Sequence, residues 1–266
     1  VSEIQERQLT TNGNNITALR VKGSFDDCQD MVKKAFLDKE LNNKFNLTSA
    51  NSINVARWLP QAFYYFYAVK KLKKKNLVFS VPSGNFGNIC AGIIAMKLGL
   101  PIDHFVASTN VNDTIPRYFK SKVLSPKPTI QTISNAMDVS NPSNFIRIQE
   151  MFENFDTLSS FLSSYSFDDY QTLEIVKEIY NNKNYIMDPH GAVGYLGLKK
   201  YLKNKPNKIG VFLETAHPIK FSKHIENTID VKLKIPKKIN KILSKNKKYI
   251  DIENYNDFKK KILNMF

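Results

Sequence analysis

Hydrophobic residues recur along this chain at two spacings, one typical of β-strands and one typical of α-helices. The segments with each spacing predict the order of the helices and strands. Residues 15–21 alternate between apolar and polar positions and stand between Gly13 and Gly23, which is typical of a β-strand. Ser24 is a suitable N-cap, and behind it apolar residues return at helical spacing as far as Phe36. The N-terminal region is therefore expected to contain one strand followed by one amphipathic helix.

A longer helix is predicted over residues 52–74, and a β–α–β unit follows it. The apolar run at 77–81 predicts a strand, a glycine turn comes next, residues 86–98 predict a helix, and residues 104–108 predict another strand. Three further helices are predicted, over 142–154, 168–181 and 191–203.

The last predicted strand, 209–214, is apolar at nearly every position. Strands buried on both faces of a parallel sheet have this composition. We therefore expect an α/β fold whose parallel-sheet core is covered by helices.

Composition limits the size of the fold and the kinds of partner that this chain can have. The chain has 266 residues, of which 42% are hydrophobic and 24% charged, enough for one large core or two modest domains. A net charge of +15 makes nucleic acid a candidate partner. However, lysine supplies nearly all of the positive charge. Proteins that read base sequence rely on arginine forks, so we expect a solvated lysine-rich surface and no nucleic-acid partner, with a non-specific polyanion contact as the alternative.

Neither the cysteines nor the most apolar stretch indicates a special environment. Cys28 and Cys90 belong to no CxxC motif, and the four histidines form no HExxH motif, so we expect neither a disulfide framework nor a metal site. Residues 58–69 are too few to cross a bilayer and predict a buried helix. With no targeting segment visible, a cytoplasmic location without a membrane partner is the default expectation.

The turn between the strand at 77–81 and its following helix is a candidate anion site. Its sequence is Ser-Gly-Asn-Phe-Gly-Asn, in which Gly84 and Gly87 let the backbone approach an anion while the amides of residues 85–88 converge at a helix N-terminus. The Lys-Ser/Thr pair of a P-loop and the third glycine of a dinucleotide fingerprint are both absent. A single phosphate monoester remains as the ligand, and a glycine turn without any ligand remains as the alternative.

A second candidate anion site lies at the start of the helix predicted over 52–74. Asn51, Ser52 and Asn54 stand at the predicted helix start, and Arg57 follows about one turn later. Amides, a hydroxyl and a guanidinium together form a binding site for phosphate oxygens. The alternative is an N-capped helix whose arginine forms a salt bridge.

Several segments together resemble the threonine synthases of the bacterial type, from about residue 4 to about residue 230. They occur in the order SANSIN…R, VPSGNFGN, TNVNDTIPRYF, SNAMDVSNPSNFIR, DPHGAVGY and TAHPIKF. The resemblance implies a pyridoxal-phosphate enzyme of the tryptophan-synthase-β-like fold, fold type II. It also implies the conversion of O-phospho-L-homoserine and water to L-threonine and phosphate, which requires two phosphate monoester sites.

The resemblance also assigns roles to residues. The cofactor phosphate is expected at Ser83, Gly84, Asn85, Phe86, Gly87 and Asn88, and the substrate phosphate at Asn51, Ser52 and Arg57. Thr215 matches the residue that hydrogen-bonds the pyridine nitrogen of the cofactor. The alternative for Thr215 is an N-cap for the segment that follows it, and both roles are compatible.

One part of the family pattern is missing from this chain. Members carry a cofactor lysine in a His-Gly-Pro-Thr…Phe-Lys-Asp segment and a Ser-Gly-Asp-Thr-Gly loop for the substrate carboxylate, and neither matches here. We therefore assign no catalytic residue on this chain. We expect a C-terminal part of such an enzyme that is inactive alone, with a non-catalytic remnant that binds phosphorylated ligands or a partner protein, or a serine/threonine dehydratase-like enzyme, as alternatives.

The same family resemblance predicts how the chain divides into domains. Residues 1–45 are expected to be the end of a smaller domain, and residues 46–266 the larger cofactor-binding domain with a lysine-rich C-terminal tail. A lone strand and helix bury too little surface to order themselves. Residues 1–45 are therefore expected to be mobile unless the rest of the smaller domain is supplied.

Overall fold

The computed structural model describes residues 2–13 and 15–265 and divides the chain into two compact units. Unit 1 combines Val1–Thr48 with Lys232–Phe266, and unit 2 is Ser49–Val231. The boundary near residue 48 lies close to the one expected at 45. The C-terminal segment differs from the expectation, because it packs with unit 1 and is not a tail of the larger part.

Unit 2 holds the expected β–α–β unit and most of the helices. Its strands are β2 (Leu77–Pro82), β3 (Ile102–Thr109), β4 (Leu162–Ser166) and β5 (Ile209–Phe212). Its α-helices are α4 (Trp58–Leu72), α5 (Gly87–Lys97), α6 (Thr114–Ser121), α7 (Phe145–Glu150), α8 (Phe155–Phe161), α9 (Asp169–Lys183), α10 (Pro189–Leu202) and α11 (Ser222–Ile229). Three 3-10 turns complete it: η1 (Val55–Arg57), η2 (Asn135–Met137) and η3 (Pro218–Phe221).

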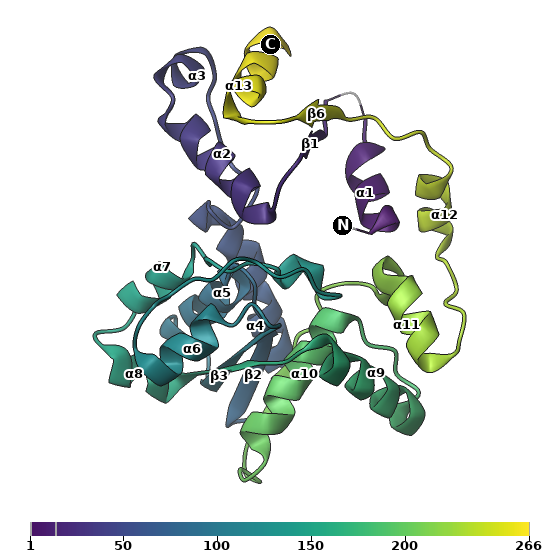
Figure 1. Cartoon of the computed structure of the whole chain (residues 1–266). Helices are drawn as coiled ribbons and strands as arrows, with labels where there is room; N and C mark the ends of the chain where they lie inside the picture. The colour runs from purple at the N-terminus through teal and green to yellow at the C-terminus, as the bar shows by residue number, and fades with distance from the viewer. Residues whose placement is uncertain (1, 14, 266) are drawn as a thin grey trace. The chain divides into compact units, whose positions relative to one another are not determined.

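The four strands of unit 2 form one parallel sheet in the order β4-β3-β2-β5. Successive side chains of β2 serve opposite faces of this sheet. Phe79 packs in the main core with α4 and α5, whereas Val78 packs against Leu198 of α10. Because both faces are covered by helices, as Figure 1 shows, the parallel-sheet α/β class expected from the sequence is confirmed.

Two sequence-based expectations about burial in unit 2 are wrong. Strand β5 is only half-buried along its length, because β2 is the only described strand with which it pairs. Helix α4 buries Trp58, Ala62 and Tyr65 but leaves Phe63 and Tyr67 about two-thirds exposed. The packing partners of an element set its burial, and an apolar composition does not.

Unit 1 is built from the two ends of the chain. Its elements are α1 (Glu3–Thr10), β1 (Leu19–Val21), α2 (Phe25–Leu37), α3 (Lys39–Lys44), α12 (Lys237–Leu243), β6 (Ile250–Ile252) and α13 (Tyr255–Met265). Strands β1 and β6 pair in parallel, and the strand expected over 15–21 is therefore shorter than predicted. The expected N-cap is confirmed, since Ser24 and Asp27 form a capping box at the start of α2.

Polar contacts also hold the two ends of the chain together within unit 1. Asp38 accepts hydrogen bonds from the Tyr255 hydroxyl at 2.9 Å and from Lys259 Nζ at 3.0 Å. Arg20 binds the Asp251 carboxylate through two nitrogens, at 2.6 and 3.0 Å. The C-terminal segment is thus part of the framework of this unit.

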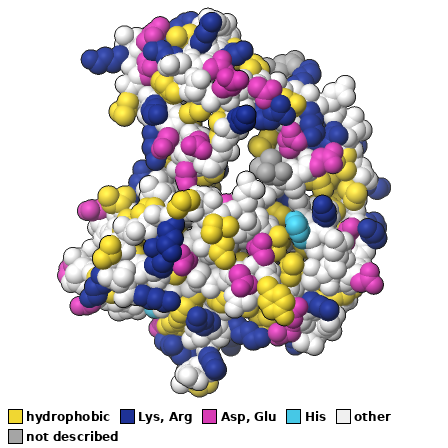
Figure 2. Space-filling model, in the orientation of Figure 1, with side chains coloured by type: hydrophobic (Ala, Val, Ile, Leu, Met, Phe, Trp, Pro, Cys, Tyr) yellow, Lys and Arg dark blue, Asp and Glu magenta, His cyan; other side chains and the backbone are white. Residues whose placement is uncertain are grey.

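Basic side chains are spread over the visible face of the molecule. On the face shown in Figure 2, Lys and Arg side chains lie among acidic and uncharged ones and do not gather into one continuous patch. Among residues 2–13 and 15–265, no helix is both long enough and apolar enough to cross a bilayer.

A buried histidine in the sheet predicts sensitivity to acid. His104 is 5% exposed, and its two ring nitrogens lie 3.1 Å from the Ser160 carbonyl and 2.9 Å from the Ser163 hydroxyl. Burial lowers the pKa of His104 to about 4, against an ordinary value of 6.5. The folded state therefore binds fewer protons than the unfolded state between these values, so stability falls as the pH falls.

We expect acidification from pH 6.5 to 4 to cost unit 2 about 3 kcal/mol through this one group. Replacing His104 with Asn should flatten the dependence, because no imidazole is then left to protonate. Denaturant unfolding at several pH values measures it. The same replacement at the exposed His224 serves as the control, and an unchanged slope in His104→Asn would contradict the assignment.

The second prediction concerns the relative stability of the two units. In β2, Leu77, Val78, Phe79 and Val81 are fully buried, whereas few large apolar side chains of unit 1, among them Leu41 and Ile252, are buried to a similar degree. Amides of β1 should therefore exchange with solvent roughly a hundredfold faster than those of β2, or faster still. Hydrogen exchange followed by mass spectrometry resolves the two strands. Equal protection would show that unit 1 is as stable as unit 2.

Candidate active site

The candidate phosphate loop, residues 83–88, joins the carboxyl end of β2 to the start of α5. Its left-handed residue is Phe86 (φ 63°, ψ 7°), and neither glycine of the loop has a positive φ. A non-glycine residue held in this region costs about 1–3 kcal/mol and is typical of functional sites. The Phe86 ring is 3% exposed and packs edge-on against Phe145, which holds the strained residue in place.

The two glycines of the loop serve close packing between protein segments. A Cβ atom at Gly84 would lie 2.8 Å from the Cα of Met137, and one at Gly87 would lie 2.5 Å from the Cβ of Ser52. The sequence-based argument, in which glycine spares room for an anion, is therefore corrected. Glycine is needed here because two other segments press against the loop from outside.

The backbone of the loop is what remains free to bind an anion. The amide groups from Gly84 to Ile89 donate no hydrogen bond to any described residue, and they lie at the N-terminus of an eleven-residue helix. Unpaired amides and the positive end of the helix dipole together attract a phosphate. The Ser83 hydroxyl donates inward to the Val81 carbonyl at 2.8 Å, and its amide bonds the Ser108 carbonyl. In this conformation Ser83 shapes the loop and presents no donor.

The second candidate segment also forms a helix start, as expected. Asn54 caps η1, with its side-chain oxygen accepting from the Ala56 amide at 3.0 Å, and Asn51 accepts from the Ile53 amide at 2.8 Å. Arg57 lies just before α4 and is exposed. Its guanidinium forms no ion pair or hydrogen bond with a described residue. The alternative in which this arginine forms a salt bridge is therefore wrong.

Ser52 brings the two candidate segments together. Its hydroxyl accepts hydrogen bonds from Asn85 Nδ2 at 3.3 Å and from Asn144 Nδ2 at 3.0 Å. It also lies directly against Gly87. The two candidate segments that the sequence predicts separately are therefore in contact.

The residues that fix this junction were given no individual role by the sequence analysis. Arg147 donates to the Ser52 carbonyl at 3.3 Å and to the Ile53 carbonyl at 2.9 Å, and its third contact is the Asn144 side chain. The amide of Ser143 donates to the Asn85 side chain at 2.7 Å. These residues belong to the segment SNPSNFIR, which contributes to the family resemblance, but sequence spacing does not show that it reaches the loop.

Thr215 lies in the irregular segment after β5 and is exposed. The N-cap alternative for Thr215 is wrong, because His217 caps η3 by accepting from the Ile219 amide at 3.1 Å. Strands β5 and β2 are parallel neighbours, so Thr215 and the phosphate loop follow carboxyl ends on the same edge of the sheet. This edge is where ligands bind in open α/β sheets.

A pair of carboxyl groups lies beside Thr215. Asp188 is fully buried and caps α10, and its neighbour Glu214 approaches so closely that a Cβ at Gly191 would lie 2.4 Å from the Glu214 carboxyl group. Burial, and then the charge and hydrogen bonding of Asp188, raise the pKa of Glu214 to about 9. For Asp188, burial opposes ionisation, but hydrogen bonds from His190 and Glu214 together outweigh it and lower the pKa. The pair therefore holds one proton at neutral pH.

The third prediction concerns this pair. The pKa of Glu214 is higher in the folded state than its ordinary value of 4.5, so the stability it contributes is lost as the pH rises towards 9. Although much of residue Glu214 is exposed, the burial of the carboxyl group itself decides this effect. Between pH 7 and 9 the Tm should fall by a few degrees, and Glu214→Gln should remove most of that fall. Thermal unfolding of the parent chain and of Glu214→Gln across this pH range measures the fall in Tm. An equal fall in both chains would contradict the prediction.

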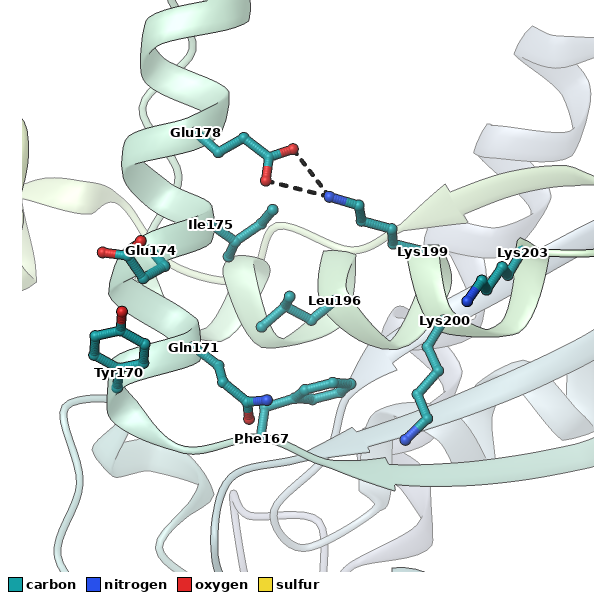
Figure 3. A pocket seen from close by; sticks show the side chains of 10 residues that line it. All are labelled: Phe167, Tyr170, Gln171, Glu174, Ile175, Glu178, Leu196, Lys199, Lys200 and Lys203. Carbon is teal, nitrogen blue, oxygen red and sulfur yellow. Dashed lines mark hydrogen bonds and ion pairs between the residues drawn. The ribbon is translucent and has the colours of Figure 1, made fainter.

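A separate groove lies away from these residues. It has a volume of about 540 Å³ and runs between α9 and α10 (Figure 3), where Lys199 pairs with Glu178 at 2.9 Å. Its lining is Phe167, Tyr170, Gln171, Glu174, Ile175, Glu178, Leu196, Lys199, Lys200 and Lys203. None of these is a predicted site residue.

Comparison with known proteins agrees with the fold. The family described as "Pyridoxal-phosphate dependent enzyme" matches residues 1–213, and the family described as "Threonine synthase, C-terminal" matches residues 191–262. The chain therefore belongs to the pyridoxal-phosphate dependent enzymes. Within them it belongs with the threonine synthases, whose C-terminal portion it matches.

Individual relatives show the extent of the match. The threonine synthase of Haemophilus influenzae is 47% identical over 244 residues, which cover 91% of this chain and 57% of that protein. The Escherichia coli (strain K12) threonine synthase is 44% identical over 242 residues, which cover 90% and 56%. A crystal structure of the Escherichia coli enzyme matches with a TM-score of 0.95 at 40% identity, over 100% of this chain and 62% of that one. The chain thus spans little more than half the length of these relatives, and the family expected from the sequence is confirmed.

Proposed function

We propose that this chain forms the phosphate-binding part of a threonine synthase, which converts O-phospho-L-homoserine and water to L-threonine and phosphate. The observation that carries this proposal is the junction at Ser52, where the free amides after Gly84 meet the helix start that carries Arg57. The reaction requires two phosphate sites, one for the cofactor and one for the substrate. A dehydratase acting on an unphosphorylated amino acid needs only the first.

The loop residues fit the phosphate of pyridoxal 5'-phosphate. Unpaired amides from Gly84 to Ile89 provide donors, and the N-terminus of α5 provides the favourable field. When bound, the cofactor supplies an electron sink for the substrate carbons. In this proposal the neutral hydroxyl of Thr215 faces the ring nitrogen, which leaves that nitrogen largely unprotonated and restrains the electron sink.

The substrate phosphate is assigned to Asn51, Ser52 and Arg57. The guanidinium is exposed and unpaired among the described residues, so it is free to grip two phosphate oxygens as a fork. Holding the ester at this end orients the rest of the substrate towards the cofactor and retains the phosphate group until it departs.

Turnover needs a cofactor lysine, and no lysine of this chain lies in the matching segment. In this proposal that lysine and the carboxylate-binding loop come from the portion of the relatives that the chain does not span. The chain alone is expected to bind both phosphate esters without converting them. A small-molecule biosynthetic reaction of this kind suits the cytoplasm and needs no nucleic-acid partner.

Titration calorimetry with four ligands tests the proposal. Pyridoxal 5'-phosphate and O-phospho-L-homoserine should both bind, whereas pyridoxal and L-homoserine, which lack the phosphate, should bind far more weakly. The two phosphate esters should not displace each other. Binding that ignores the phosphate group, or competition for a single site, would contradict the proposal.

A further inference from the structure

His190 lies at the start of α10 and connects two buried groups. The residue is 3% exposed. Its Nδ1 lies 2.6 Å from Asp188 Oδ1, and the same oxygen accepts the His190 backbone amide at 2.9 Å. The ring also packs on Phe221, with centroids 4.9 Å apart. The imidazole therefore has one position and one orientation.

The second ring nitrogen reaches a different part of the chain. The backbone amide of Ala136 donates to His190 Nε2 at 3.2 Å. An amide is a donor only, so Nε2 carries no proton and the ring proton sits on Nδ1, where Asp188 accepts it. The hydrogen bonds thus run in one direction, from the Ala136 amide through the ring to the buried carboxylate.

Ala136 belongs to η2, the turn that presses on the phosphate loop. A Cβ at Gly84 would lie 2.9 Å from the Ala136 carbonyl oxygen and 2.8 Å from the Cα of Met137. The turn is held on its other side by Asp138, which accepts from Thr132 and Asn110. The hydrogen bond to His190 fixes the amide side of η2 to α10.

We propose that His190 is a positioning residue for the phosphate loop: it holds η2 against Gly84 and so keeps the loop amides aligned on the cofactor phosphate. The inference rests on the proposed function, because it assumes that the loop binds this phosphate. His190 itself does not touch the ligand in this scheme. Its effect passes through Ala136 and Gly84.

Two replacements separate this role from a purely structural one. In His190→Gln the side-chain amide reaches the position of Nε2 and retains an acceptor for the Ala136 amide. In His190→Asn the side chain reaches only the position of Nδ1 and retains the contact with Asp188. The affinity for pyridoxal 5'-phosphate should fall about tenfold in His190→Asn and stay within about twofold of the parent chain in His190→Gln. Pyridoxal, without a phosphate, serves as the matched probe and should bind equally to all three chains.

The outcomes are distinct. Loss of phosphate-dependent affinity in His190→Gln with retention in His190→Asn would place the role at Asp188 and the start of α10, and would overturn the inference. Equal affinities in all three chains would also overturn it. If the parent chain does not distinguish pyridoxal 5'-phosphate from pyridoxal, the proposed function itself fails.

A measurement on the parent chain does not depend on how the variants fold. Nuclear magnetic resonance detects scalar coupling across an N–H···N hydrogen bond. Coupling between the Ala136 amide and His190 Nε2 is expected, and the amides of Gly84 and Asn85 should shift when inorganic phosphate is added. Absence of the coupling would overturn the inference.

Discussion

Replacing Gly87 with valine should weaken binding of pyridoxal 5'-phosphate roughly ten- to a hundredfold, since overpacking of this kind costs about 1–3 kcal/mol. The first added carbon would lie 2.5 Å from the Cβ of Ser52 and 3.0 Å from its hydroxyl oxygen. The loop and the Ser52 segment cannot both stay in place. The alignment of the loop amides is then lost, and calorimetric titration of the cofactor measures that loss.

The sequence by itself predicts that Gly87→Val affects only the cofactor phosphate. The structure extends the expectation to the substrate phosphate, because the group that must move is Ser52. Affinity for O-phospho-L-homoserine should therefore also fall.

Gly13→Val is the matched control for this variant, since a Cβ at Gly13 meets nothing within 4 Å. Combining Gly87→Ala with Ser52→Gly removes the steric conflict and should recover cofactor binding relative to Gly87→Ala alone. A Gly87→Val chain that binds both esters normally would show that this contact does not matter.

Replacing Arg57 with lysine should weaken binding of O-phospho-L-homoserine by roughly ten- to a hundredfold. A guanidinium grips two phosphate oxygens, whereas an ammonium presents a point charge, and a charge-assisted hydrogen bond contributes about 1.5–3 kcal/mol. The Arg57 guanidinium is exposed and forms no hydrogen bond or ion pair with a described residue, so the Tm and the cofactor affinity should not change. In a protein that joins this chain to the portion of a relative that it does not span, kcat/KM should fall by a similar factor.

Arg147→Lys provides the contrast to Arg57→Lys. Arg147 is committed to the backbone of Ser52 and Ile53 and to the Asn144 side chain, so its replacement should lower the Tm and weaken both ligands. If Arg57→Lys released the cofactor and left substrate affinity unchanged, the two phosphate sites would have been assigned the wrong way round.

Elements with a local signal were predictable from the sequence. Strand β2, its turn and α5 fall where the apolar run and the glycines place them, and Ser24 caps α2 as expected. Strand β4 was missed because its sequence, Leu-Ser-Ser-Tyr-Ser, lacks an apolar run. Two of its serines, Ser163 and Ser164, bond distant partners, His104 and the Ala107 carbonyl, which no local pattern reveals.

The candidate site shows the same division. The glycines, the asparagines and Arg57 could be predicted as site residues, because their residue types and spacing are visible in short segments of the sequence. Arg147 and His190 do not, because each acts on a segment more than fifty residues away, bonding the carbonyl of Ile53 and the amide of Ala136. The Asp-Pro pair at 188–189 was a readable sign of a helix start, but not of the histidine's second contact.

The sequence alone determined the α/β class, the positions of two helix starts suited to phosphate, and the family, because each depends on residues that are near neighbours in the chain. Only the tertiary structure decided that the two sites meet at Ser52, that the glycines are required by neighbouring segments, and that the C-terminal segment belongs to unit 1. The physical reason is that close packing depends on which distant segments are brought together, and the order of residues along a single segment does not specify its partners.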